Sequence, residues 1–377
     1  MDQRALLDVL HLCAGNVYGG IERIVSECAI SRALSPSMAP SFAVCYEGRL
    51  SEEIDASGAR CVRIGGARMS RPHTVLRARR KLRRVLAASK PDAVICHSSW
   101  VAGLAAPVVR GAGIPVATWI HDRLSGRTWA ERWAGLTPPD ALIVNSHYTD
   151  ETVGAVYPGV PHEVVYAPVP AAAASGRSRG EIRASLDVDS STPVVLIVSR
   201  FERWKGHREL IAALCDIKEP WTLWIAGRPQ RGDEAEYERD LRSLVDGGGI
   251  SERVRFLGER RDVPELMRAA DVHCQPNSAA EPFGLTYVEA LYAALPVVTT
   301  GVGGALEIVT PECGLLVPPG DAEALRNALR RVIDDPELRA RLGAAGPPRA
   351  AALCDPARQL ALLADVMTRA IAARGVA

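Results

Sequence analysis

The chain has 377 residues, of which 47% are hydrophobic and 5% aromatic, and its 45 basic and 44 acidic side chains leave a net charge of +1. This length exceeds the size at which one hydrophobic core stops growing, so we expect two domains, and the balanced charge argues against nucleic acid as a partner. Nine cysteines scattered singly, with no apolar run of 18 residues, favour reduced thiols and a soluble, cytoplasmic protein.

Short β-rich apolar runs alternate with amphipathic helical stretches along the whole chain, which is typical of parallel sheets with crossover helices. In the first half we predict strands at 6–12, 42–46, 61–64, 93–96, 116–120, 141–144 and 164–166. The second series is 194–199, 222–226, 254–257, 272–275, 297–299 and 315–317. The fold class is therefore α/β, with two doubly wound Rossmann-like domains whose ligands bind beyond the carboxyl ends of the strands.

The alternation is interrupted near residue 170 by a run rich in alanine, serine and glycine, which is linker-like in composition. We therefore predict a first domain over residues 1–170, a linker over 171–192 and a second domain over 193–355. The remaining residues, 356–377, predict a helix.

The loop after the first strand contains Gly19 and Gly20 and opens a helix. It lacks the G-x-G-x-x-G spacing of a dinucleotide site, which argues against a dehydrogenase. His121 ends the fifth strand, where a side chain can reach a ligand; a lone histidine is more often structural, but this position favours a function. His97 and Asn145-Ser146 also stand at strand ends and are secondary candidates.

A basic segment over residues 75–86 has apolar side chains on the opposite helical face. Its cations are Arg77, Arg79, Arg80, Lys81, Arg83 and Arg84, and its apolar residues are Val75, Leu76, Leu82, Val85 and Leu86. Such a helix can bind an anionic membrane peripherally. It can equally be an ordinary crossover helix that packs on the sheet, which is the interpretation we favour.

Two cations follow the first strand of the second half. Arg200 comes directly after Ser199 at the strand end, and Lys205 lies five residues on, just before a helix. Cations at this place can hold a diphosphate and stabilise the negative charge that grows on it as a leaving group.

Residues 281–289 place two carboxylates, Glu281 and Glu289, eight positions apart around a glycine. We expect a helix to start there, so that the N–H groups of Phe283, Gly284 and Leu285 lack intrahelical partners and attract an anion. Carboxylates suit hydroxyl groups rather than phosphate. A site with both features predicts a ligand that is part phosphate and part polyol, as a nucleotide sugar is.

This run resembles the E-x7-E signature of the retaining glycosyltransferases with two Rossmann-like domains, the GT-B fold, and in particular glycosyltransferase family 4, or group 1 type. Residues 199–206 resemble the family's G-R-x-x-x-x-K-G segment, with Ser199 in place of a glycine. Residues 301–307 and 19–22 resemble its G-G-x-x-E and G-G-x-E elements. The resemblance implies a bacterial-type hexosyltransferase that moves a sugar from a nucleoside diphosphate to an acceptor hydroxyl in the cleft between its domains, by a front-face route. It also implies that the last helix returns to the first domain.

The resemblance assigns roles to single residues. Glu281 and His121 contact the donor sugar, and Glu289 holds the ribose. The catalytic set it implies is His121, Glu281, Arg200 and Lys205, and the donor-binding set is Gly19, Gly20, Arg200, Lys205, Phe283, Gly284, Leu285 and Glu289.

We expect neither a cofactor nor a metal ion. Asp187-Val188-Asp189 spells the D-x-D metal motif of another glycosyltransferase fold, but it precedes a strand, so we interpret it as a coincidence. We expect the donor to be a nucleotide sugar, with UDP preferred over GDP and ADP, and the acceptor to be a small molecule, a glycan or a lipid-linked molecule. A sugar-nucleotide epimerase and a non-catalytic nucleotide-sugar-binding protein are the alternatives.

Overall fold

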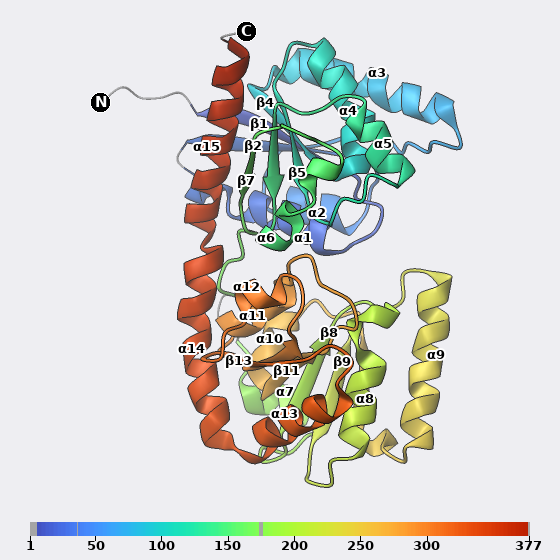
Figure 1. The fold of residues 1–377 in the computed structure, drawn as a ribbon, viewed down its shortest axis with the longest axis vertical. Helices are drawn as coiled ribbons and strands as arrows, with labels where there is room; N and C mark the ends of the chain where they lie inside the picture. Colours follow the sequence, from blue (N-terminus) through green and yellow to red (C-terminus); the bar gives the residue numbers. More distant parts are fainter. Residues whose placement is uncertain (1–5, 36, 173–175, 376–377) are drawn as a thin grey trace. The chain divides into compact units, whose positions relative to one another are not determined.

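The computed structural model describes residues 6–35, 37–172 and 176–375 of the chain. They form two units, Met1–Pro170 with Cys354–Ala377, and Ala171–Leu353 (Figure 1). The last helix, α15 (Pro356–Gly375), belongs to the first unit, where it packs on strands β5 and β6. In the described part of the chain, no helix is both long enough and apolar enough to cross a membrane.

The first unit has, among its described residues, a seven-stranded parallel sheet in the order β3-β2-β1-β4-β5-β6-β7. Its strands are β1 (Leu7–Cys13), β2 (Met38–Val44), β3 (Cys61–Arg63), β4 (Ala93–His97), β5 (Val116–Ile120), β6 (Ala141–Val144) and β7 (His162–Val164). Its helices are α1 (Gly20–Ile30), η1 (Arg32–Leu34), α2 (Arg49–Ala56), α3 (Pro72–Ser89), α4 (Ser99–Gly111), α5 (Trp129–Gly135), α6 (His147–Asp150) and η2 (Val153–Ala155). Helices α3, α4 and α5 lie on one side of the sheet and α15 on the other (Figure 1).

The second unit has, in its described part, a six-stranded parallel sheet in the order β10-β9-β8-β11-β12-β13. The strands are β8 (Val194–Val198), β9 (Thr222–Ala226), β10 (Val254–Gly258), β11 (Val272–Gln275), β12 (Val297–Thr300) and β13 (Gly314–Val317). The helices are α7 (Arg179–Ala184), η3 (Arg203–Lys205), α8 (His207–Cys215), α9 (Gly232–Gly247), η4 (Ser251–Arg253), α10 (Val263–Ala269), α11 (Leu285–Tyr292), α12 (Ala305–Ile308), α13 (Ala322–Asp334) and α14 (Pro336–Cys354). Side chains of α8, α9 and α13 pack on one face of the sheet.

The two parallel sheets with crossover helices confirm the predicted α/β, Rossmann-like fold class. Strands β4, β5, β6 and β9 are buried along their whole length, because helices cover both faces of a parallel sheet. The main shift concerns β2, which starts at Met38 rather than at 42 and runs through Pro40 beside β1. Proline lacks a backbone donor and so weakens a strand pattern in the sequence.

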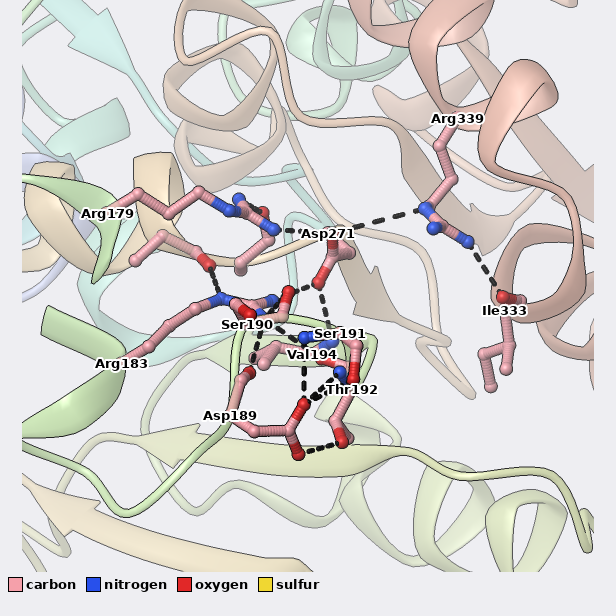
Figure 2. Close-up of polar contacts among 12 residues, drawn as sticks. Arg179, Arg183, Asp189, Ser190, Ser191, Thr192, Val194, Asp271, Ile333 and Arg339 are labelled. Carbon is pink, nitrogen blue, oxygen red and sulfur yellow. Dashed lines mark hydrogen bonds and ion pairs between the residues drawn. The ribbon is translucent and has the colours of Figure 1, made fainter.

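The segment 171–192, which the sequence suggested to be a linker, is part of the second unit; residues 173–175 of it lie outside the described residues. Helix α7 forms there because Ser178 and Glu181 make a reciprocal capping box. The buried guanidinium of Arg183 then donates to the backbone carbonyls of residues 189, 190 and 192 and to the carboxylate of Asp271, as Figure 2 shows. Arg179 also contacts Asp271, at 2.6 Å, so this segment is anchored to the second sheet.

Candidate functional site

The predicted residues of the second unit follow three adjacent strands. Arg200 and Lys205 come after β8, Glu281 after β11, and residues 301–304 after β12. The carboxyl ends of parallel strands meet at one edge of the sheet, where α/β proteins bind their ligands.

The centre of this group is an ion pair between Lys205 and Glu281. The Lys205 Nζ lies 2.5 Å from the Glu281 Oε2, and both side chains are 14% exposed. The same carboxylate oxygen accepts hydrogen bonds from Gln275 (3.3 Å) and Asn277 (3.2 Å), and the Lys205 ammonium lies 3.9 Å from the centre of the Trp204 ring. Both residues were predicted from the sequence as site residues, but their ion pair was not.

The amides that hold Glu281 are themselves fixed by a buried phenol. The Tyr287 hydroxyl lies 3.0 Å from the Asn277 side-chain nitrogen and 3.0 Å from the Thr299 hydroxyl. Burial raises the pKa of Tyr287 well above its ordinary value, with the Glu281 charge adding to the effect, so the phenol stays neutral. These polar groups were missed from sequence, although Gln275 is the last residue of the buried strand β11 and Asn277 lies two residues beyond it.

The helix expected after residue 283 is present as α11. Gly284 caps it with φ +112°, and a Cβ there would lie 2.3 Å from the Tyr287 ring, so both backbone and packing require glycine. Phe283 is buried, whereas Leu285 and Glu289 are partly exposed on the helix.

The segment 301–304 packs against the loop that contains Glu281. The Gly304 N–H donates to the Glu281 carbonyl at 2.8 Å, and a Cβ on Gly303 would lie 2.4 Å from that same oxygen. These glycines thus permit close packing of two backbone segments, which fixes the position of the Glu281 backbone.

Arg200 is bound by carboxylates that the sequence did not reveal. Its guanidinium contacts Glu202 at 3.2 Å and pairs with Glu234 of α9, a side chain that is only 3% exposed. In the described structure the Arg200 Nε remains buried without a hydrogen-bond partner. Arg200 would therefore have to exchange or share its carboxylates in order to bind a diphosphate.

Ser199, which departs from the family pattern, is accommodated locally. Its hydroxyl lies 3.2 Å from the His207 Nε2. Its backbone carbonyl is approached so closely by Gly227 that a Cβ there would lie 1.9 Å away. The tight approach at this position is thus made by Gly227.

In the first unit, Gly19 caps α1 and its N–H donates to the Glu22 carboxylate at 3.1 Å. Gly20 begins the helix and is exposed. The backbone at Gly19 is extended, and the left-handed conformation in this loop occurs at Gly15, with φ +76°. The glutamate of the G-G-x-E element therefore has a capping role here.

His121 lies immediately after β5, is 7% exposed, and is in contact with a second histidine. Its Nε2 lies 3.2 Å from the Nδ1 of His97, and its backbone carbonyl accepts a hydrogen bond from Asn145 at 3.2 Å. Burial lowers the pKa of His121 to about 3, so the imidazole is neutral near pH 7. Asn145, a secondary candidate, thus positions the His121 backbone.

The D-x-D sequence has a structural role in the described residues. The Asp189 carboxylate accepts the backbone N–H groups of Ser191 (2.8 Å) and Thr192 (2.9 Å) and both of their hydroxyls, and these bonds lower its pKa. Figure 2 shows these bonds next to the hydrogen bonds of Arg183. The carboxylate is therefore part of a local turn.

The basic helix α3 presents most of its cations to solvent. Arg79 is the exception, because it donates to the α4 carbonyls of Leu104 (2.9 Å) and Gly103 (3.0 Å). Four of the others border a groove of about 490 Å³ beside β3, which is lined by Arg60, Val62, Arg77, Arg80, Lys81, Arg84, Val85 and Ala88. Leu76, expected on the apolar face, is 57% exposed.

Family models of glycosyltransferases match both units of the chain. The family model of group 1 glycosyl transferases matches residues 178–349, and that of glycosyltransferase family 4 matches residues 18–172. A phosphatidyl-myo-inositol mannosyltransferase of Mycobacterium leprae is 32% identical over 326 residues, which are 72% of this chain and 84% of the relative. A GDP-mannose-dependent monoacylated alpha-(1-6)-phosphatidylinositol monomannoside mannosyltransferase of Corynebacterium glutamicum is 34% identical over 185 residues. That match spans 46% of each chain, and the chain likewise spans about half the length of several other relatives.

Solved structures share the fold at lower identity. Anabaena Alr3699/HepE in complex with UDP and glucose has a TM-score of 0.85 and 23% identity, and the match covers 96% of this chain and 99% of that one. WaaG, a glycosyltransferase involved in lipopolysaccharide biosynthesis, has a TM-score of 0.71 and 18% identity, with 96% and 99% covered.

Proposed function

Since this chain belongs to the group 1 glycosyltransferases of family 4 and has their GT-B fold, we propose that it transfers a hexose from a nucleoside diphosphate sugar to an acceptor hydroxyl. The observation that supports this most is the Lys205–Glu281 pair at the end of β8 and β11. It offers a cation for phosphate next to a carboxylate for sugar hydroxyls, which are the two halves of the donor.

We propose that the diphosphate replaces carboxylates around the two cations of the second unit. Lys205 and Arg200 bind its oxygens, and the N-terminus of α11 at Gly284 and Leu285, with Phe283 before it, adds backbone N–H groups. Glu281, released from Lys205, accepts hydrogen bonds from the sugar, and Glu289 from the ribose. In the first unit, His121 binds the sugar and Gly19 and Gly20 approach the phosphate or the acceptor.

The reaction we propose proceeds with retention on one face of the sugar. The bond between the anomeric carbon and the diphosphate oxygen breaks, and the acceptor oxygen forms its bond to the same carbon from the same side. The acceptor proton passes to the departing phosphate oxygen. Lys205 and Arg200 stabilise the charge that develops there, so cationic side chains rather than a metal ion have this role.

The donor we propose is a UDP-sugar, because a neighbour of the same fold was solved with UDP and glucose. A relative acting on GDP-mannose makes the guanine nucleotide the necessary comparison. A thermal-shift panel of UDP, GDP, ADP and their glucose and mannose derivatives tests this, because a ligand stabilises the folded state by mass action. Equal melting temperatures throughout, with no product in an acceptor assay, would contradict the transferase proposal.

A sugar-nucleotide epimerase of the same architecture and a non-catalytic binding protein make different predictions. The epimerase would convert the donor alone into a new isomer, which proton NMR detects. The binding protein would be stabilised by the donor and leave it intact over days. A transferase gives free nucleoside diphosphate and a glycosylated acceptor.

For the partners of this enzyme, we propose that the α3 groove binds an anionic membrane surface. Arg77, Arg80, Lys81 and Arg84 are exposed, and no ion pair is formed by them within the described residues. Helix α5, which packs on α4 as α3 does, exposes Trp129 (55%), an aromatic residue of the type enriched at membrane interfaces. Each cation near an anionic bilayer contributes about 1 kcal/mol.

Vesicle sedimentation tests this contact. We expect wild-type protein to bind vesicles of phosphatidylglycerol and phosphatidylcholine in a salt-sensitive way and to ignore phosphatidylcholine alone. The Arg80→Glu/Arg84→Glu variant should bind at least about tenfold more weakly. The control Arg331→Glu/Arg341→Glu carries the same charge change on exposed residues of the second unit and should bind normally. Equal losses of vesicle binding in both variants would mean that binding depends on the net charge of the protein and not on α3.

A further inference from the structure

Three histidines of the first unit form a ladder across its sheet. His11 lies in β1, His97 ends β4 and His121 follows β5, and these three strands are adjacent. The ring centroids of His11 and His97 are 5.3 Å apart and those of His97 and His121 are 5.4 Å apart, and both pairs are stacked. This spacing is close to the distance between neighbouring strands, so each strand contributes one rung.

The three imidazole rings are linked by two nitrogen–nitrogen contacts. The His11 Nδ1 lies 3.0 Å from the His97 Nε2, and the His97 Nδ1 lies 3.2 Å from the His121 Nε2. The two terminal nitrogens, His11 Nε2 and His121 Nδ1, are buried and have no hydrogen-bond partner in the described structure. Burial keeps all three rings neutral, since it lowers the pKa of each imidazole.

A neutral imidazole has one N–H, and this couples the tautomers of the three rings. Both contacts are hydrogen bonds only if all three protons are on Nδ1 or all three are on Nε2. Any mixed arrangement sets two N–H groups, or two lone pairs, against each other. The ladder therefore has two states, which differ in what His121 presents at its outer nitrogen.

The environment of the two ends favours one state. If the protons were on Nε2, the N–H of His11 would be orphaned at a residue that is 0% exposed. Orphaned buried N–H groups are rare in proteins, because nothing replaces their bond to water. If the protons are on Nδ1, the orphan N–H is that of His121, which is also buried but belongs to a residue that is 7% exposed and follows the carboxyl end of β5, where such sheets bind their ligands.

We propose that His11 and His97 are positioning residues that hold His121 as its Nδ1–H tautomer, so that it donates a hydrogen bond to an oxygen of the bound sugar. This inference rests on the proposed function for the identity of the acceptor oxygen, whereas the tautomer is a property of the protein alone. His121 then cannot serve as a base, because its only other nitrogen accepts the proton of His97.

The tautomer is tested directly by NMR of protein labelled with ¹⁵N-histidine, since protonated and bare imidazole nitrogens have separate ¹⁵N shifts. At pH 7 we expect His11, His97 and His121 to be neutral with the proton on Nδ1. His97→Phe keeps a ring in the stack but removes both nitrogen contacts, and His121 should then lose its preference for Nδ1–H. His11→Phe, next to Phe42, is the second variant if His97→Phe does not fold, and should weaken the same preference.

Kinetics with the donor found by the panel and an acceptor found by the acceptor assay separate positioning from a merely structural role. We expect His97→Phe to lower kcat by about tenfold, the effect of one lost hydrogen bond, with little change in KM. In a His121→Phe background the same substitution should have no further effect on kcat, because His97 acts through His121.

A wild-type His121 with its proton on Nε2, or an unchanged His121 tautomer in folded His97→Phe, would overturn the inference. So would additive losses in the double variant. Failure to find any glycosyl transfer would refute the proposed function, while the NMR result would still decide whether the ladder fixes the tautomer.

Discussion

Gly206 lies against the carbonyl of Pro276, and a Cβ on this glycine would stand 2.0 Å from the carbonyl oxygen. Its φ of +80° is also in the left-handed region. The contact places Lys205 beside the loop after β11, next to its partner Glu281. The requirement for glycine after Lys205 is thus steric.

Gly206→Ala should therefore destabilise the second unit by at least about 3 kcal/mol, since both the backbone and the packing resist a side chain. Gly320→Ala is the matched control, because Gly320 has a similar φ of +76° but nothing within 4 Å of its Cβ position. The control should cost only about 1 kcal/mol. Urea unfolding measures both, and equal losses would show that backbone strain alone is responsible.

Lys205→Met should lower kcat/KM by about 10- to 150-fold, the value of one charge-assisted hydrogen bond to phosphate. It should also lower the melting temperature, because the Glu281 carboxylate, 14% exposed, loses its counter-charge. Lys205→Met/Glu281→Gln should recover stability without recovering activity. Recovery of both would mean that Lys205 serves the fold and not the donor.

Glu289→Ala should lower kcat/KM by about one to four orders of magnitude, according to whether one or two hydrogen bonds to the ribose are lost. The exposed Glu323→Ala on α13 controls for removal of a helical carboxylate. Steady-state kinetics with the donor measures the effect. Unchanged turnover in Glu289→Ala would show that Glu289 does not bind the ribose.

The first unit should lose stability in acid through its buried histidines. Burial lowers the pKa of His11 and of His121 to about 3, so below about pH 6.5 the unfolded chain binds protons that the folded one does not. The free energy of unfolding is therefore highest above about pH 6.5, and at pH 5 it is lower by about 2 kcal/mol for each such histidine. His11→Phe should reduce this fall, whereas the exposed His73→Phe should not. Urea midpoints between pH 5 and 8 measure it.

The strands could be predicted from the sequence because buried parallel strands are short, continuous apolar runs. The bounds of β5, β6, β9 and β11 coincide with the predicted ranges, since a polar residue, proline or glycine directly follows each of them. Helix α7 was missed because its packing depends on Arg183, whose partner Asp271 is 88 residues away.

The candidate site was predictable in its charges but not in its pairing. Local spacing placed Arg200 and Lys205 at a strand end, but only the fold brings them to Glu234 and Glu281. The histidine ladder was also missed, because no local pattern shows that β1, β4 and β5 are neighbours. His11 looks in the sequence like any residue within an apolar strand.

The mutual neutralisation of Lys205 and Glu281 has a consequence for competition among ligands. A lone anion such as orthophosphate must break the 2.5 Å ion pair and leaves the Glu281 carboxylate without its cation. A sugar diphosphate bound as we propose breaks the same pair but gives each partner a replacement, a phosphate oxygen for Lys205 and hydroxyl groups for Glu281. In the ligand-free protein, this ion pair thus discriminates against ligands that carry only a phosphate or only hydroxyl groups. We therefore expect orthophosphate to be a poor inhibitor of this enzyme.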